Sequence, residues 1–197
     1  EKNSMTTPPK KPRTKPAEER LDDLMNAAEK LFLSKGFVNT TVSEIVIVAD
    51  VAKGTFYHYF QSKNDIMEAL RTRYMDWYLG YIQSALDSQK SATAKLKSWC
   101  ENSVKYYVEK QNIHDMLFHD EYHGRSNDHE TRAVEQIKAI LAFGEQNKAW
   151  PELPHELMAT MIYHSMHAAV DNLANSTEYD QHTLGEILYQ RFSQLIK

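Results

Sequence analysis

Apolar side chains recur at helical spacing along most of this chain, whereas no alternating, strand-like pattern extends beyond a few residues. The first such stretch predicts an amphipathic helix that starts near Pro16 and ends at Gly36, which suits a left-handed C-terminal cap. Comparable stretches predict further helices at about 92–110, 113–123, 129–147, 155–175 and 182–196. The pattern therefore indicates an all-α protein.

Two short helices are predicted between these stretches, on either side of a break at Asp50. Thr41 can cap the first of them, and Glu44, three residues later, can complete a capping box. The second buries Phe56 and Phe60, four residues apart, and so turns polar side chains outward. Outward-facing donors on a short, well-supported helix are typical of a protein that reads the DNA major groove.

A much longer helix is predicted next. Ser62 can cap its start, Asp65 in its first turn complements the helix dipole, and its apolar pattern continues to about Ser88. Because this helix is longer than the small module requires, we expect it to connect two domains. The expected organisation is a flexible basic arm at 1–16, a first domain at 17–63 and a second domain at 64–197.

The segment from Thr41 to Lys63 resembles the DNA-binding signature of the tetracycline-repressor (TetR) family of bacterial transcription regulators. The shared pattern is Thr-Val-x-x-Ile-x-x-x-Ala-x-Val-x-Lys-Gly-Thr-Phe-Tyr-His-Tyr-Phe-x-x-Lys, and the resemblance covers about residues 18–70. It implies an N-terminal three-helix helix-turn-helix DNA-binding domain. A long helix would join this domain to a C-terminal helical ligand-binding and dimerisation domain.

Four positions depart from the family pattern. Asp50 stands where glycine is usual, but aspartate tolerates the left-handed conformation that the turn requires. Ala52 replaces a common capping Ser or Thr, which can cost about 1 kcal/mol at that helix start. Ile47 and Val48 occupy positions that are usually polar, and they weaken the expectation of DNA contacts from the first short helix.

The resemblance assigns the outward surface of the two short helices to operator DNA. Lys53, Thr55 and His58 are the best candidates for base edges, whereas Thr41 and Tyr57 offer hydroxyls to phosphates. The alternative is a solvated face on a purely structural helix pair. The complete set of predicted DNA-binding residues is Thr41, Ser43, Lys53, Gly54, Thr55, Tyr57, His58 and Lys63.

The net charge of −4 is unfavourable for a DNA-binding protein, but the charge is unevenly distributed. Residues 1–63 hold ten Lys and Arg against eight Asp and Glu, and residues 64–197 hold thirteen against nineteen. Within residues 1–16, five basic residues stand against Glu1 alone, so this arm can neutralise phosphates or reach into a minor groove. A solvated tail is the alternative. We expect residues 1–4, which precede Met5, to be additions for expression and not native sequence.

The resemblance implies that a small molecule binds inside the second domain and releases DNA. The predicted ligand contacts are aromatic, soft or polar residues at inward positions: Trp99, Tyr106, Tyr107, Met116, Phe118, His119, Tyr122, Met161 and His164. The alternative is ordinary core, which such residues usually form at helical spacing. The acidic neighbours suggest a cationic aromatic ligand, since rings and carboxylates both attract such groups. These neighbours are Glu101, Asp115, Asp120 and Glu121.

Histidine spacing raises the question of a metal. His119 and His123 are four residues apart, with Asp115 one turn earlier. A second set is formed by His164, His167 and Asp171. Because nine histidines scattered over helices make such coincidences common, and no cysteine cluster accompanies them, we expect no metal site and no cofactor. The single cysteine, Cys100, is expected to be a core thiol.

By resemblance, the last two helices form the surface of a homodimer, whose two reading helices would cover a palindrome. Their apolar stripes are Met158, Ile162, Ser165, Met166, Ala169, Val170 and Leu173, followed by Leu184, Ile187, Leu188, Phe192 and Leu195. The alternative is that these stripes serve only the core of one chain. No apolar run approaches the roughly 20 residues that span a bilayer, and no secretory signal is visible. A cytoplasmic location without membrane contact is therefore expected.

These observations predict a ligand-responsive transcriptional repressor that binds a palindromic double-stranded DNA operator as a dimer and is released by a small molecule. A cationic aromatic drug or biocide as the effector, and an efflux pump gene as the target, are family-level hypotheses. The alternatives are an activator or an effector-independent DNA-binding protein. An enzyme is not expected, nor are catalytic residues. The chain lacks a phosphate loop, a nucleophile elbow and a paired-histidine metal motif with a flanking glutamate.

Overall fold

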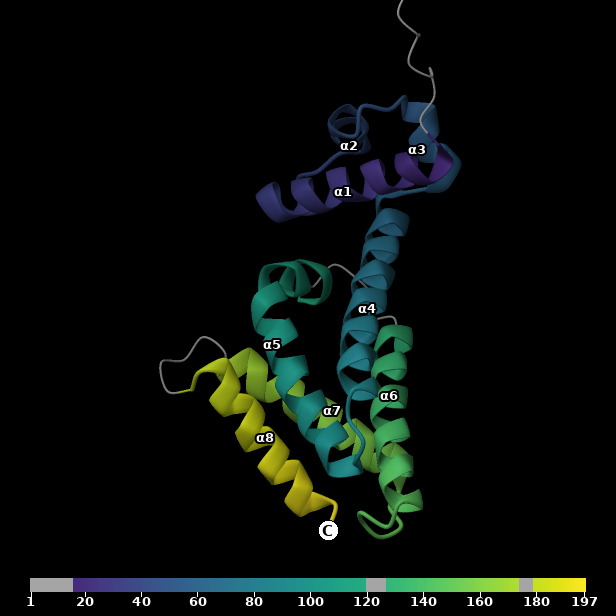
Figure 1. Cartoon of the computed structure of the whole chain (residues 1–197). Coiled ribbons are helices and arrows are strands. Elements are labelled where there is room, and N and C mark those ends of the chain that lie inside the picture. Colours follow the sequence, from purple (N-terminus) through teal and green to yellow (C-terminus); the bar gives the residue numbers. More distant parts are fainter. Residues whose placement is uncertain (1–15, 120–126, 174–178) are drawn as a thin grey trace, which may run out of the picture. The chain divides into compact units, whose positions relative to one another are not determined.

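The computed structural model describes residues 16–119, 127–173 and 179–197 of the chain. Within those residues every regular element is a helix, as the apolar pattern predicted (Figure 1). The helices are α1 (Ala17–Lys35), α2 (Val42–Val48), α3 (Lys53–Tyr59), α4 (Lys63–Asp87), α5 (Ala92–Phe118), α6 (Asn127–Gln146), α7 (His155–Leu173) and α8 (Gln181–Leu195). None of these helices combines the length and apolar character needed to cross a membrane.

One predicted helix boundary is wrong. The sequence suggested separate helices at 92–110 and 113–123, but α5 runs without a break from Ala92 to Phe118. The stretch between the two predicted helices is polar, yet it contains neither glycine nor proline. A helix can pass through two polar residues when no proline interrupts its backbone hydrogen bonds, because the small propensity cost of one asparagine is outweighed by the helix around it.

Contacts within the chain divide it into two compact units, Glu1–Ala69 and Leu70–Lys197. The sequence suggested a boundary at residues 63 and 64, where α4 begins. The division by contacts falls six residues further along, within α4. Each unit contains a buried core of its own.

In the first unit, α1 packs against both short helices, α2 and α3. Leu24, Ala28 and Phe32 follow one side of α1 and are at most 2% exposed. Ile45 of α2 and Phe56 of α3 are likewise fully buried. A helix of seven residues is not stable alone, so this shared core is what holds α2 and α3 in shape.

The predicted capping box and turn around α2 are confirmed. The Thr41 hydroxyl accepts from the Glu44 N–H, and the Glu44 carboxylate accepts from the Thr41 N–H at 2.8 Å. Hydrogen bonds from Lys35, and then from Thr41, lower the pKa of Glu44 to about 2. After α2, Asp50 has the left-handed φ of 53° that the turn requires. At the end of α1, Gly36 has the expected positive φ of 82°, but its ψ of 158° lies outside the left-handed helical region.

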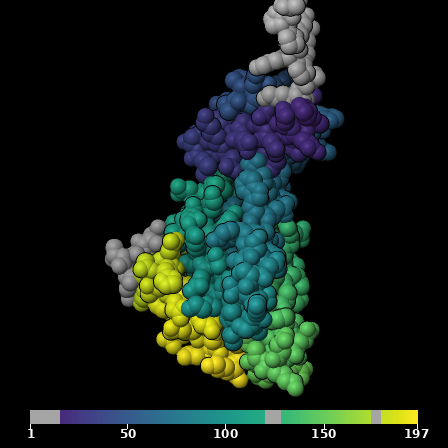
Figure 2. Space-filling model, viewed as in Figure 1, coloured from purple at the N-terminus to yellow at the C-terminus, as the bar shows by residue number. Residues whose placement is uncertain are grey.

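In the second unit, α8 packs along α5 and α7 packs along α6, while α5 also contacts α6 and α7. The space-filling view shows α8 lying against α5 without a gap (Figure 2). Gly185 permits this approach, because a Cβ there would lie 2.9 Å from the Cα of Glu101. Trp99 and Cys100 are buried in this unit, and burial raises the pKa of the thiol far above its usual range. Cys100 is thus the core thiol that the sequence predicted.

Trp150 closes the C-terminal end of α6. Its indole N–H donates to the Leu141 carbonyl at 2.8 Å, and only 7% of the residue is exposed. The indole ring lies directly against Gly144, where any Cβ would collide with it. The packing therefore requires a residue without a side chain at this position of α6.

Candidate functional site

The exposed side of α3 gathers the central part of the predicted DNA-binding set. Lys53, Gly54, Tyr57 and His58 are exposed, and Tyr57 keeps 53% of its surface accessible. Phe56, on the other side of the helix, is fully buried. Residues four apart are neighbours on a helix surface, so Lys53 and Tyr57 form one row and Gly54 and His58 another. The helix thus presents two adjacent rows of exposed residues that a binding partner could contact.

Gly54 is not required by the packing of the unit itself. A Cβ at this position would have no neighbouring heavy atom within 4 Å, and the backbone does not adopt a positive φ there. A residue with a side chain would fit and would favour the helix. The lack of a side chain therefore matters only to a partner that approaches α3 from outside.

The predicted DNA-binding residues on and just before α2 differ in how available their side chains are. Thr41 is exposed, but its hydroxyl is engaged with Glu44 in the capping box. Ser43 is exposed, and Ile47, four residues later, keeps 76% of its surface accessible. The sequence suggested that Ile47 packs on α1 or on the arm, and α1 does not cover it. Thr55 of α3 is half-buried.

Lys63, predicted to lie on the DNA-facing surface, directs its ammonium into the first unit. The ammonium donates to the carbonyls of Phe37 and Thr40, the latter at 2.7 Å, and lies 4.1 Å from the centre of the Phe37 ring. Burial lowers the pKa of this ammonium from its usual value. These contacts hold the turn that leads into Thr41. We therefore assign Lys63 a positioning role, and its contact with DNA stays a prediction.

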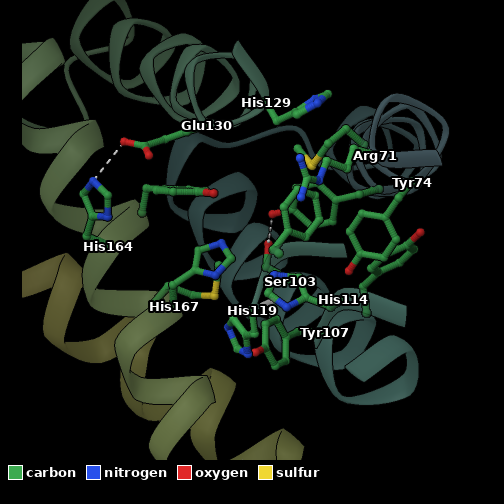
Figure 3. A pocket seen from close by; sticks show the side chains of 16 residues that line it. Arg71, Tyr74, Ser103, Tyr107, His114, His119, His129, Glu130, His164 and His167 are labelled. Atoms are coloured by element: carbon green, nitrogen blue, oxygen red, sulfur yellow. Dashed lines mark hydrogen bonds and ion pairs between the residues drawn. The ribbon is translucent and has the colours of Figure 1, made fainter. Parts of the chain in front are cut away.

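A cavity of about 240 Å³ lies within the second unit, where side chains of four helices converge (Figure 3). The lining residues from α4 are Arg71, Tyr74, Met75 and Tyr78. From α5 and the residue after it, the lining residues are Ser103, Tyr106, Tyr107, His114, Phe118 and His119. The remaining residues, from α6 and α7, are His129, Glu130, Tyr163, His164, Met166 and His167.

Tyrosines form a large part of this lining. Tyr106 makes edge-to-face contacts with Tyr74 and Tyr78, at centroid distances of 5.6 and 5.4 Å. The hydroxyls of Tyr78 and Ser103 are hydrogen-bonded at 3.0 Å (Figure 3). Burial raises the pKa of Tyr106 to about 12 and also raises that of Tyr78. These phenols are therefore uncharged at neutral pH and can donate or accept hydrogen bonds.

Histidines form another part of the lining. The rings of His114 and His167 lie 5.7 Å apart, and His114 is only 6% exposed. Burial lowers the pKa of His114 to about 3 and that of His167 to about 4. Both imidazoles are thus neutral at pH 7, and each presents one donor and one acceptor nitrogen.

Charge is sparse in the cavity wall. Glu130 is the acidic member of the lining, and one of its oxygens lies 3.0 Å from His164 Nε2 (Figure 3). Arg71 is 4% exposed, and its Nε donates to the Leu117 carbonyl at 2.7 Å. Glu101 and Asp115, which suggested a cationic ligand, are not among the lining residues. The other two acidic neighbours, Asp120 and Glu121, lie outside the described residues.

The predicted ligand contacts divide between cavity, core and surface. Those that line the cavity are Tyr106, Tyr107, Phe118, His119 and His164. Trp99 is instead part of the buried core, and Met161 is 41% exposed. Met116 does not reach the lining, and Tyr122 lies outside the described residues. Helical spacing identified an inward side of each helix, but it did not distinguish the side that faces a cavity from the side that faces core.

Sequence reasoning missed the contribution of α4. Arg71, Tyr74, Met75 and Tyr78 line the cavity, although this helix was interpreted only as a connection between domains. One signal was available in the sequence. Arg71 stands within the apolar stripe of α4, and a charged residue that is buried needs a polar partner. Such a residue is a good marker of a polar cavity.

The apolar stripes predicted to form a dimer surface are mostly buried within one chain. The buried members are Met158, Ile162, Met166 and Val170 on α7, and Leu184, Leu188 and Phe192 on α8. Their burial agrees with the alternative, in which the stripes serve the core. The large apolar side chains left exposed on these helices are Leu157, Met161 and Leu195, at 58%, 41% and 47%.

Comparison with known proteins identifies relatives of the first unit. Residues 24–70 match the model of the family described as bacterial regulatory proteins, tetR family. The HTH-type transcriptional repressor KstR2 of Mycolicibacterium smegmatis is 29% identical over 140 residues, which cover 71% of this chain and 65% of that protein. The HTH-type transcriptional regulator QacR of Staphylococcus aureus is 25% identical over 140 residues, covering 66% and 72%. The match to KstR2 of Mycobacterium tuberculosis spans half of that protein's length.

Solved structures share the fold over most of the chain. FadR of Bacillus subtilis, in complex with stearoyl-CoA, has a TM-score of 0.75 and 21% identity, covering 89% of this chain and 99% of that one. The fatty acid degradation regulator FadR of Bacillus halodurans has a TM-score of 0.72 and 21% identity, covering 92% and 97%. At these identities the likeness concerns the fold alone. Residues 24–70 therefore match the tetR family of bacterial regulatory proteins, and most of the chain shares the fold of these solved structures.

Proposed function

We propose that this chain is a ligand-responsive transcriptional repressor that binds a palindromic DNA operator as a homodimer. The observation that carries the proposal is the exposed side of α3, where Lys53, Gly54, Tyr57 and His58 stand on a helix fixed by the buried Phe56. The curated relatives named as HTH-type transcriptional repressors support repression of transcription over activation. Because bacterial operators lie in the cytoplasm, the proposal includes a cytoplasmic location.

The proposed contacts follow from what each group can offer to DNA. Lys53, Thr55 and His58 are donors suited to base edges in the major groove, and the Tyr57 hydroxyl suits a phosphate oxygen. Gly54 leaves room for the backbone to approach. Ser43, before α3, adds a hydroxyl from α2. Lys63 acts indirectly, by fixing the turn before Thr41.

A second copy of the chain is proposed to dock on the exposed faces of α7 and α8. Leu157 and Met161 are four residues apart and therefore lie on one face of α7, and Leu195 is exposed on α8. One seven-residue reading helix covers few base pairs, whereas two related by a two-fold axis cover two half-sites. Their separation would be near one turn of B-DNA, roughly 34–36 Å, or a multiple of it.

The cavity is the proposed effector site. Its phenols, hydroxyls and neutral imidazoles suit a small aromatic molecule with hydrogen-bonding groups. The lining holds one arginine, Arg71, and one acidic residue, Glu130, which lies 3.0 Å from His164, so its formal charges give no preference for a cation. A long alkyl chain, such as that of the stearoyl-CoA named in the Bacillus subtilis FadR structure, would leave many of these polar groups unpaired.

Release is proposed to act through α4, which begins in the first unit and lines the cavity further along. A ligand that binds better to one tilt of this helix shifts the population toward that tilt, and hence away from the operator spacing. A cavity argues against an effector-independent DNA-binding protein. An efflux pump gene as the target is a family-level proposal, and the genes beside this one would test it.

The proposed function is tested by selection from a pool of random double-stranded DNA. The purified chain should enrich an inverted repeat and bind it with two chains per site. A thermal-shift screen of neutral, anionic and cationic aromatic compounds should then find molecules that also weaken binding to that repeat. Enrichment of no sequence over bulk DNA would refute the repressor. Equal thermal shifts from a cation and its neutral analogue are expected, and a strict requirement for the cation would contradict the effector class.

Gly54→Ala is expected to separate stability from DNA binding. The new methyl group meets no atom of the chain and favours the helix, so stability should stay equal or rise by up to about 1 kcal/mol. Operator affinity should nevertheless fall, because the methyl group stands where the DNA backbone or groove must approach. Thermal unfolding and a DNA titration on the same preparation measure both effects. Unchanged affinity in Gly54→Ala would remove Gly54 from the reading surface.

A further inference from the structure

We propose that the end of α5 carries a site for a divalent transition-metal ion of the Zn²⁺ type, held by His114 Nδ1, Asp115 Oδ1 and His119 Nδ1. The sequence noted the spacing of His119 and His123 but led us to expect no metal, because nine scattered histidines make such coincidences common. The structure brings a different histidine, His114, to the same place. The site goes beyond the proposed repressor function, and it can be tested without DNA.

The three ligand groups lie close enough together to reach one metal ion. All of them lie within 4.8 Å of one another. Asp115 Oδ1 is 3.6 Å from His114 Nδ1 and 3.1 Å from His119 Nδ1. Metal–ligand bonds of about 2.0–2.2 Å at tetrahedral angles separate ligand atoms by roughly 3.3–3.6 Å. A metal ion would therefore fit between these groups with only small adjustments of the side chains.

Two of these atoms are buried without a hydrogen bond among the described residues, and Asp115 Oδ1 has only its ion-pair contact with His119 Nδ1 at 3.1 Å. Neither His114 Nδ1 nor Asp115 Oδ1 has a hydrogen-bond partner among the described residues, and His114 is only 6% exposed. Buried polar atoms are normally paired, and an exception calls for a bound species. A cation shared by a nitrogen lone pair and a carboxylate oxygen would satisfy both atoms at once.

The surroundings of His119 resemble the outer shell of a metal site. His119 is the C-cap of α5, where the backbone leaves the helix and turns the ring back toward Asp115. Its other nitrogen, Nε2, is 3.8 Å from Asp171 Oδ1 on α7, and the Tyr107 hydroxyl donates to the same carboxylate. A metal ion bound to Nδ1 would place the ring proton on Nε2, which faces the Asp171 carboxylate.

The donor set identifies the class of metal and indicates a use for the site. Two imidazoles and one carboxylate favour zinc and neighbouring transition metals over calcium or magnesium, which prefer oxygen ligands. Three protein ligands leave a fourth position open. Because His114 and His119 also line the cavity, that position faces the space in which an effector would bind (Figure 3). The ion could thus hold a water molecule or a donor atom of the effector.

Isothermal titration of the tag-free, chelator-treated chain with Zn²⁺ tests the proposal. One ion per chain is expected, and Co²⁺ at the same site should give the strong visible absorption of tetrahedral coordination. His119→Ala and Asp115→Asn should weaken binding at least about 100-fold. These two residues are chosen because the more deeply buried His114 is needed for packing. Asp171→Asn should weaken binding by about 10–100-fold through the outer shell.

His182→Ala is the matched control, because it removes an exposed histidine of α8 that lies outside the cluster. Its affinity for Zn²⁺ should equal that of the unchanged chain. Absence of Zn²⁺ binding, or equal binding by the unchanged chain and by His119→Ala, would overturn the site. Either result would leave the proposed repressor function untouched, since that function is measured by selection of an inverted repeat.

Discussion

Replacing His58 or Tyr57 by alanine will strongly weaken operator binding while the dimer persists. Both side chains are exposed on α3, although the Tyr57 ring also makes an edge contact with the buried Phe56 at 5.4 Å between centroids. A good base contact contributes about 1–3 kcal/mol, and a dimer makes each contact twice. A total loss of about 2–6 kcal/mol corresponds to a roughly 30-fold to more than 10⁴-fold weaker affinity. A DNA titration, with sedimentation to confirm the dimer, measures the effect.

Tyr59→Phe supplies the control within the same helix. Tyr59 lies on the inner side of α3, where its hydroxyl donates to the Ala17 carbonyl at 2.9 Å. Loss of that hydroxyl should change stability slightly and leave sequence preference intact. His58→Ala and Tyr57→Ala should also differ from each other: the first relaxes the preferred sequence, and the second weakens binding to all sequences alike. Full operator affinity in both alanine variants would disprove the reading surface.

Gly144→Ala will strongly destabilise the second unit. The new methyl group occupies the position of the Trp150 indole, so the ring must leave its pocket or α6 must shift. Overpacking of this kind costs about 1–3 kcal/mol. Expulsion of the ring costs more, because a tryptophan buries about 150–250 Å² at about 25 cal/mol per Å². The hydrogen bond to Leu141 would be lost as well. Urea unfolding measures the change in free energy.

Gly80→Ala is the matched substitution on an open helix surface. Gly80 lies within α4, and a Cβ there would have no neighbour within 4 Å. This variant should be stabilised by roughly 0.5–1 kcal/mol, since alanine favours a helix interior over glycine. Trp150→Leu should offset part of the loss in the Gly144→Ala background, because it removes the ring that collides. Equal unfolding midpoints for the two glycine variants would show that Trp150 does not pack on Gly144.

Local chemistry explains why the first unit was predictable from its sequence. Thr41 and Glu44 are three residues apart, so the capping box could be recognised without any knowledge of the fold. The left-handed turn at Asp50 is likewise set by a single residue. The role of Lys63 could not be found in this way, because its acceptors are carbonyls more than 20 residues earlier in the chain.

The cavity was predictable only in part, because it depends on which sides of four helices converge. Tyr106 and His164 were identified from their inward positions, but Trp99 faces ordinary core and Met161 faces outward. Helical periodicity reports the polarity of a face and not the identity of its neighbour. For the same reason the sequence could note only the spacing of His119 and His123, from which no metal site was expected. The proximity of His114 arises from the turn that ends α5.

The positions of the tryptophans make the two units spectroscopically distinct. All three tryptophans, Trp77, Trp99 and Trp150, lie after residue 69, so the first unit contains none. Intrinsic tryptophan fluorescence therefore reports only the second unit, whereas helical circular dichroism reports both. Trp77 is 55% exposed and the other two are buried, so iodide should quench one of three emitters. Unfolding of the DNA-reading unit alone would lower the dichroism and leave the emission unchanged.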